Sequence, residues 1–348
     1  MTAGPERAGF SEAAGRTITR IYADATAEVL EQVARRLARG ITRPGWAEEK
    51  LHQLLDLQHD VSGVIAKLDK ASQARAGKLI AEAYALGRSP GIVLTNVRAV
   101  EALAHDIAGL ADDVMFRLSG THPRILRWAD DVYRDVISDA VKQTAAGTLS
   151  TRAAAQRALD RFTARGVTGF IDRTGQSWSL TSYAEMAVRT GTMRAHLAGT
   201  TARLQENGFD LVEVQGLTES CPVCLPWQGA ILSLSGTSPQ YPALSLAIDA
   251  GLFHPNCRHD IDAFTPGFTK PPDLAPDGTV RQNYEDRMRQ RALERRVRGW
   301  KYRTAAADPF GDTTETLRDR AGLRSAQADL RAFLEATGRK RLPYRESI

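Results

Sequence analysis

All three cysteines of this chain lie between positions 221 and 257, and this clustering limits what the segment around them can fold into. Cys221 and Cys224 form the motif CPVC, and Cys257 lies in HPNCRH beside His254 and His259. Two thiolates three residues apart on a tight turn form the knuckle that grips a tetrahedral ion. Three thiolates with one imidazole suit zinc. The cluster therefore predicts a structural Zn²⁺ clip in a module too small to rely on its core alone.

The spacing leaves the fourth ligand open. His254 lies three residues before Cys257 and so repeats the spacing of the CPVC knuckle. His259 lies two residues after Cys257, and in a strand these two side chains point the same way. We predict Cys221, Cys224, Cys257 and His254 as the metal ligands, with His259 as the alternative fourth ligand.

Other interpretations of the cluster are weaker. Reduced packing thiols would not explain why every cysteine lies beside two histidines, and CPVC does not open a helix after a βαβ strand, as a thioredoxin-like pair would. A catalytic dyad of Cys257 and His259 has no third, orienting group at a recognisable spacing. No zinc-protease, phosphate-loop or nucleophile-elbow motif occurs in the chain. The sequence gives no positive reason to predict an enzyme.

Residues 1–147 are expected to form a long helical arm. Alanine, arginine, leucine and glutamate favour helix, and aromatic residues make up only 7% of the chain. Apolar residues recur at three- and four-residue steps from Ile18 to Leu37 and again from Leu51 to Leu68, and these segments stop at Gly40 and Gly87. Two further helices are predicted, roughly over 93–118 and 123–146.

Residues 148–268 read as a compact α+β module. A helix after Ser150 or Thr151 and a short hairpin or loop at 170–180 precede a long helix that stops at Gly208, with Ser182 and Glu185 at capping-box spacing. Strands are predicted at 210–217, around 231–234 and after Cys257, with a short helix at 243–251. The predicted fold class is α+β, mostly α.

Residues 269–348 are predicted to form a linker, a basic helix and a polar tail. The helix is expected up to about Arg298, and another around 316–336. The stretch from Arg281 to Arg303 holds nine basic and three acidic residues, although the whole chain has a net charge of only +5. Side chains on one helical face, with Trp300 and Tyr302 as stacking surfaces, could bind the phosphate backbone of DNA or an acidic portal surface. The predicted contact residues are Arg287, Arg291, Arg295, Arg298, Lys301 and Arg303.

Nothing in the sequence indicates a membrane protein. No apolar run approaches the roughly 20 residues that span a bilayer, and the N-terminus lacks a secretion signal. We therefore expect reduced thiols, which makes a structural disulfide a poor default.

Several motifs occur in the order typical of one protein family. SYAEMAVRT, GFDLVEVQG, CPVCLPWQGAILSLSG and GLFHPNCRHDIDAFTPG closely resemble the phage minor capsid protein type 2 family, and more distantly the Mu-type F head-morphogenesis proteins. The resemblance covers about residues 165–270 and the basic run after them. It places the family's cysteine–histidine motif on the five residues above, and its helix motif on Tyr183, Glu185, Met186, Arg189 and Thr190, which we interpret as packing and hydrogen-bonding positions.

The resemblance implies a structural minor capsid or head-morphogenesis protein of a tailed bacteriophage. Its partners would be the portal protein, the major capsid or scaffolding protein and packaged double-stranded DNA. It would lie in the virion, inside the capsid, after assembly in the host cytoplasm. The alternatives are a Cys/His-dependent hydrolase or toxin-like enzyme, and a zinc-containing DNA-binding protein.

Overall fold

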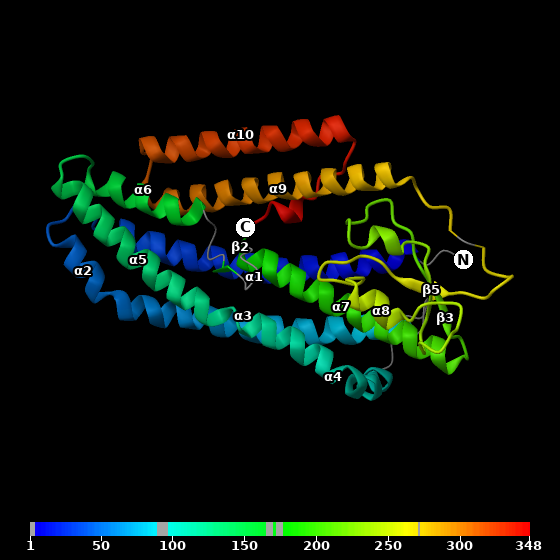
Figure 1. Cartoon of the computed structure of the whole chain (residues 1–348). Coiled ribbons are helices and arrows are strands. Elements are labelled where there is room, and N and C mark those ends of the chain that lie inside the picture. The colour runs from blue at the N-terminus through cyan, green and yellow to red at the C-terminus, as the bar shows by residue number, and fades with distance from the viewer. Residues whose placement is uncertain (1–3, 89–96, 165–169, 172–176, 271) are drawn as a thin grey trace. The chain divides into compact units, whose positions relative to one another are not determined.

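The first half of the chain is helical, as predicted. A computed structural model describes residues 4–88, 97–164, 170–171, 177–270 and 272–348 (Figure 1). Its first helices are α1 (Gly4–Ala38), α2 (Trp46–His52), α3 (Leu54–Arg88), α4 (Val97–Ser119), α5 (His122–Ala145) and α6 (Thr151–Ala164). The predicted start of the fourth helix at 93 lies outside the described residues. The segment expected as one helix from 46 to 87 is broken after α2, beside the fully buried Lys50, whose Nζ donates to the side chains of Glu49 and Gln53.

The second half adds the strands and the basic helix. Its elements are β1 (Phe170–Ile171), β2 (Ser177–Trp178), α7 (Leu180–Glu206), β3 (Leu211–Val214), β4 (Ile231–Ser233), α8 (Leu244–Asp249), β5 (Ile261–Ala263), α9 (Asp277–Ala307) and α10 (Thr314–Thr337). The mostly helical α+β fold class is thus confirmed. The predicted capping box at Ser182 is wrong, because α7 begins earlier, where the hydroxyl of Ser179 accepts from the backbone N–H of Ser182.

The chain forms two compact units, each assembled from three segments. Unit 1 consists of Met1–Ile18, Gln73–Arg117 and Glu185–Arg289, and unit 2 of Thr19–Ser72, Leu118–Ala184 and Gln290–Ile348. Helices α1, α3, α4, α7 and α9 each contribute residues to both units. The division of the chain into functional regions at residues 147 and 268, which the sequence suggests, stays a prediction.

Unit 1 contains a three-stranded antiparallel sheet in the order β4-β3-β5. The central strand places Val212 opposite Leu232 on β4 and Ala263 on β5. The fully buried Val212, Val214, Leu232 and Ile261 share one core cluster with Cys224 and Cys257. Two of the three thiols are therefore part of the core that the sheet covers.

Helix α7 packs closely against α3 within unit 1. A Cβ on Gly199 would lie 2.3 Å from the carbonyl oxygen of Tyr84, and one on Gly87 would lie 2.2 Å from that of His196. Both glycines thus permit a backbone approach that no other residue allows. This packing holds the middle of α7, whose other side chains reach the cysteine–histidine cluster.

Unit 2 contains the C-terminal part of α9 packed antiparallel to α10 (Figure 1). Leu293 and Val297 of α9 meet Ala326, Leu330 and Leu334 of α10 in one core cluster. Trp300 lies directly against Gly322, where a Cβ would come within 2.5 Å of the indole ring. The polar tail predicted from the sequence thus folds back as a helix onto the basic one.

Unit 2 also buries two carboxyl groups side by side. Asp160 of α6 and Asp319 of α10 are only 6% and 0% exposed, and each has one oxygen without a hydrogen-bond donor in the described structure. Nη2 of Arg303 lies 2.6 Å from Asp319 and 3.8 Å from Asp160. Burial, followed by the charge of Asp319, raises the pKa of Asp160 to about 8. One proton shared between the two carboxyl groups accounts for this arrangement.

Candidate metal centre

The CPVC motif forms a tight knuckle directly before a short 3₁₀ turn. The carbonyl oxygen of Cys221 accepts from the backbone N–H groups of Cys224 and Leu225, at 3.1 and 3.0 Å. The turn brings both sulfur atoms to the same side, where each lies within 4.8 Å of the other. Cys224 is fully buried, whereas Cys221 is half-buried.

The HPNC segment forms a second knuckle that faces the first. The backbone N–H of Cys257 donates to the carbonyl oxygen of His254 at 2.9 Å, across Pro255 and Asn256. Asn256 adopts the left-handed conformation with φ of 68°, which asparagine tolerates better than most residues. The knuckle places Cys257 Sγ 3.7 Å from Cys224 Sγ.

The five candidate ligands form two overlapping triads around Cys224. One triad contains Cys221, Cys224 and His254, and the other contains Cys224, Cys257 and His259. In each triad the ligand atoms lie within 4.8 Å of one another. Every metal-binding residue predicted from the sequence, including the alternative histidine, is therefore brought to one place.

The Cys224–Cys257 edge of the cluster fits a zinc ion on distance, and all five donors fit it on chemistry, although Cys221 and Cys257 belong to different triads. Zinc–sulfur bonds of about 2.3 Å in a tetrahedron put two sulfur atoms roughly 3.8 Å apart, close to the 3.7 Å that separates Cys224 from Cys257. Sulfur and imidazole are ligands that zinc prefers. When bound there, zinc would cross-link the two knuckles.

Both imidazoles are oriented by hydrogen bonds on the ring atom that faces away from the thiols. Nδ1 of His254 lies 2.7 Å from the carbonyl oxygen of Pro255, and Nε2 of His259 lies 3.3 Å from Ser220 Oγ. Ser220 itself donates to the carbonyl oxygen of Cys221, so its oxygen accepts from His259. His254 thus turns Nε2, and His259 turns Nδ1, towards the sulfur atoms.

The three thiols differ in acidity because they share protons. Hydrogen bonds, first from Cys224 and then from His254, lower the pKa of Cys221 to about 3. The corresponding bonds from Cys224 and His259 lower the pKa of Cys257 to about 4. The pKa of Cys224 is raised by its bonds to both neighbours. A metal ion that binds all three sulfur atoms would therefore have to displace the proton of Cys224.

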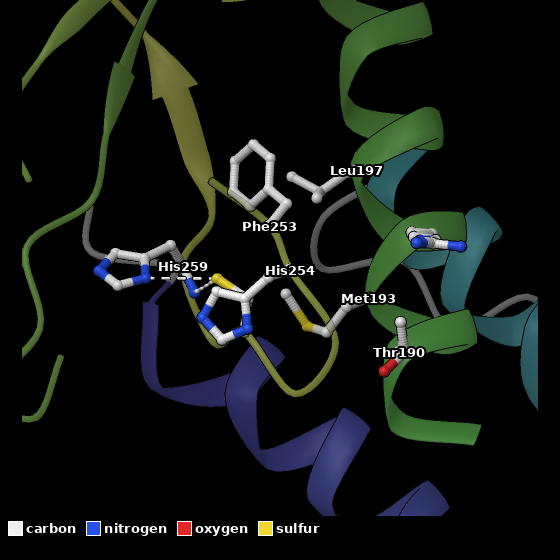
Figure 2. A pocket seen from close by; sticks show the side chains of 8 residues that line it. Thr190, Met193, Leu197, Phe253, His254 and His259 are labelled. Carbon is white, nitrogen blue, oxygen red and sulfur yellow. Dashed lines mark hydrogen bonds between the residues drawn. The ribbon is translucent and has the colours of Figure 1, made fainter. Parts of the chain in front are cut away.

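Helix α7 supports the second knuckle from one side. Thr190 Oγ1 accepts from the backbone N–H of Asn256 at 3.2 Å, and Nε2 of the buried His196 lies 3.0 Å from Asp260 Oδ2, next to His259. Figure 2 shows Thr190, Met193 and Leu197 on α7 facing the loop that carries Phe253 and both histidines, across a small pocket. The contacts of Thr190 fit its interpretation as a hydrogen-bonding position.

Replacing Thr190 with valine is expected to weaken metal binding without abolishing it. The change removes the acceptor for the backbone N–H of Asn256. The knuckle, in which Asn256 holds a left-handed conformation, is then less restrained. Loss of a supporting hydrogen bond behind a metal ligand typically costs about 10–100-fold in affinity. Chelator competition would measure the effect, and Thr190→Ser, which keeps the hydroxyl, should bind like the unaltered protein. Equal affinity of both variants would contradict the supporting role.

Ion pairs join the metal loops to two helices. Arg258, between Cys257 and His259, lies 3.4 Å from Glu12 of α1 and 3.3 Å from Glu219. Glu219 in turn lies 3.6 Å from Nε of Arg287 in α9. These side chains are largely buried, which makes the pairs stronger than typical surface salt bridges. The clip is thus connected to both the first helix and the basic helix.

The structure places the six predicted contact residues of α9 in different surroundings. Arg295 is exposed, Lys301, Arg287 and Arg291 are half-buried, and Arg298 is buried, with hydrogen bonds to Ser182 Oγ and the carbonyl oxygen of Arg345. Arg303 pairs with Asp319 and stacks on Trp300. Tyr302 is buried and offers no stacking surface. Partners within the protein thus occupy much of the face that the spacing predicted for phosphate.

Some residues of the site carry no recognisable sequence signal. Ser220, His196 and Asp260 act through contacts between distant segments, and neither their spacing nor their type marks them. Only position could have drawn attention to two of them, because Ser220 directly precedes CPVC and Asp260 directly follows HPNCRH.

The fold and the site together define a mostly helical protein whose small sheet carries a cysteine–histidine cluster able to hold a metal ion. Residues 11–335 match the family described as phage minor capsid protein 2, so the match extends from α1 into α10. This chain belongs to the phage minor capsid protein 2 family.

One curated relative comes from Lactococcus phage LL-H and is named a structural protein. It is 26% identical over 213 residues, which cover 58% of this chain and 57% of the relative. The matched region thus spans less than two thirds of the relative's length. No solved structure matches the chain. Among the described residues, no helix combines the length and apolar character needed to cross a membrane.

Proposed function

We propose that this phage minor capsid protein lies inside the head near the portal, where it helps head assembly. The observation that carries the proposal is the family match over residues 11–335, which includes the helices and the cysteine–histidine cluster alike. The portal protein and the major capsid or scaffolding protein are the proposed partners. Assembly would take place in the host cytoplasm, and the protein would stay in the virion.

We further propose that Zn²⁺ has a structural role in this protein. The ligands would be Cys221, Cys224, Cys257 and one of the two histidines, as predicted from the sequence. The burial of Cys224, Cys257 and His259 supports a closed structural site over a catalytic one, because a catalytic zinc needs an open position for water or substrate. The same burial disfavours a hydrolase that uses Cys257 and His259.

The test of location is co-purification. An affinity-tagged copy of the protein, produced during phage infection, should bring down the portal protein, and mass spectrometry of purified heads should detect it. Finding it with neither portal nor heads would contradict the proposal. A protein that binds DNA with salt dependence but never associates with heads would favour a zinc-containing DNA-binding protein instead.

A contact with packaged DNA is proposed for the exposed side of α9. Besides the predicted Arg295, Arg281 and Arg289 are exposed, and their eight-residue separation places them about 80° apart around the helix, so both can face one DNA surface. Such side chains bind phosphate without sequence preference and release counterions.

Reversing the charge at Arg281 and Arg289 to glutamate should weaken DNA binding. If each arginine contacts one phosphate, the slope of log affinity against log salt falls by about 2 units. Fluorescence anisotropy with a short duplex at several salt concentrations measures the slope. The matched control reverses Arg324 and Arg331, which are exposed on α10 and change the net charge equally. An identical loss in both variants would show that net charge, not this face, governs binding.

A further inference from the structure

Helix α9 is held by different kinds of contact along its length. From residue 290 onwards several apolar side chains are buried, and Leu293 and Val297 lie in the core cluster with α10. Among residues 277–289, all of which the structure describes, Val280 is the only buried apolar side chain. The position of this first half of α9 therefore depends mainly on its polar contacts.

The first half of α9 contacts the loop that leads into the CPVC knuckle. The side-chain amide of Asn283 donates to the carbonyl oxygen of Thr218 at 2.9 Å. One turn further along the helix, Nε of Arg287 lies 3.6 Å from Oε2 of Glu219. Thr218 and Glu219 precede the candidate ligand Cys221 by three and two residues. A metal ion that fixes this ligand therefore also restrains the loop on which the helix rests.

Glu219 also pairs with the second knuckle. The same Oε2 accepts from Nη1 of Arg258 at 3.3 Å, and Arg258 stands between Cys257 and His259 in the chain. The side chains of Arg258, Glu219 and Arg287 are only 25%, 20% and 15% exposed. Ion pairs that are covered to this degree are screened less than pairs on the open surface. One carboxylate thus joins both knuckles to α9.

We propose that the metal clip positions the first half of α9 through Glu219, and thereby sets how Arg281 and Arg289 are presented to the phosphates of DNA. This inference rests on the proposed zinc clip and on the proposed DNA contact, and it makes the second depend on the first. Glu219 is not among the candidate ligands and offers no positive charge to phosphate, so it is a positioning residue. Without the ion the two loops lose their cross-link, and the helix half loses its polar contacts with them.

Hydrogen exchange of the full-length protein, kept under reducing conditions, tests the positioning role. Glu219→Ala should still bind one zinc ion and keep the protection of β3, β4 and β5. Its amides in residues 277–289 should nevertheless exchange about tenfold faster, because a charged hydrogen-bonded contact of this helix half is lost. In the unaltered protein, chelation should cause the same acceleration.

Two further variants keep this test decisive. Glu219→Gln retains the size of the side chain and a hydrogen-bond acceptor, so it should give an intermediate exchange rate and decides the matter if Glu219→Ala folds poorly. The matched control is Glu82→Ala, which removes a carboxylate from a pair with Lys78 on the surface of α3. This control should leave residues 277–289 unchanged.

Fluorescence anisotropy with a short duplex measures the consequence for DNA binding. Glu219→Ala and Glu82→Ala both make the protein more positive by one charge. Only Glu219→Ala should lower the slope of log affinity against log salt, by about 2 units if both phosphate contacts are lost. A full slope in a variant whose helix half has lost protection would overturn the link to DNA.

The remaining outcomes separate this inference from the proposals beneath it. If residues 277–289 exchange alike in zinc-bound Glu219→Ala and in the control, the positioning role is overturned, and the clip and the DNA contact stand. An unaltered protein that binds no zinc would overturn the clip instead. An unaltered protein that binds zinc but no duplex would overturn the DNA contact.

Discussion

Replacing Cys224 with serine is expected to abolish metal binding and to unfold the three-stranded sheet. Cys224 is the residue that the two ligand triads share, and it is fully buried in the core cluster beneath β3, β4 and β5. Structural zinc contributes about 10–16 kcal/mol of apparent binding energy in small zinc-folded domains. Whole domains are stable by only about 5–15 kcal/mol. The free energy lost with this ligand therefore exceeds the stability that the small core beneath the sheet can supply.

Hydrogen exchange and metal analysis would measure the two consequences together. Peptides from β3 to β5 should lose protection in Cys224→Ser, and the bound zinc should disappear. Val223→Ser is the matched control, because Val223 lies in the same knuckle but is 50% exposed and offers no ligand. If Cys224→Ser keeps full protection across the sheet, the core alone holds the module and the clip is dispensable.

Replacing Asp160 with asparagine is expected to stabilise the protein at alkaline pH. At neutral pH Asp160 and Asp319 share a proton, and above the raised pKa of about 8 two buried carboxylates face one arginine, Arg303. An asparagine amide donates to Asp319 at every pH. We expect the free energy of unfolding at pH 9.5 to rise by about 1–3 kcal/mol, the cost of an unsatisfied buried group.

The sign of the pH dependence follows from the direction of the shift. The folded pKa of about 8 lies above the unfolded value of about 3.9. The contribution of Asp160 to stability is therefore fully present below about pH 4 and is lost as the pH rises through about 8. Urea unfolding between pH 6 and pH 9.5 should show this loss in the unaltered protein and a flatter profile in Asp160→Asn. Asp312→Asn, at an exposed carboxylate, should leave the slope unchanged.

Much of the helical fold could be predicted because its signals are local. Apolar residues at helical spacing, with Gly40 and Gly87 as stops, placed the ends of α1 and α3 within a few residues, whereas α1 begins at Gly4, well before the pattern. The strands at 211–214 and 231–233 followed from β-branched residues between turn signals. The break at Gln53 was missed, since it depends on the buried Lys50 and its acceptors.

The site could be predicted in composition but not in its internal geometry. The spacing of the five cysteine and histidine donors allowed them to be predicted as one cluster, because a metal cluster needs specific residue types at short intervals. Spacing did not reveal Ser220 on His259, or Thr190 under Asn256, since these contacts join segments far apart in the sequence. The surroundings of the arginines in α9 could not be predicted for a related reason. Helical periodicity locates Arg298 on a face but does not tell whether solvent or protein covers it.

We propose that a bound metal ion closes the two knuckles of this phage minor capsid protein. Native mass spectrometry of the full-length chain, expressed with zinc and purified under reducing conditions, tests it most directly. We expect a mass increase of one zinc ion per chain that disappears under chelation together with protection of β3, β4 and β5. A metal-free chain with the sheet fully protected would contradict it.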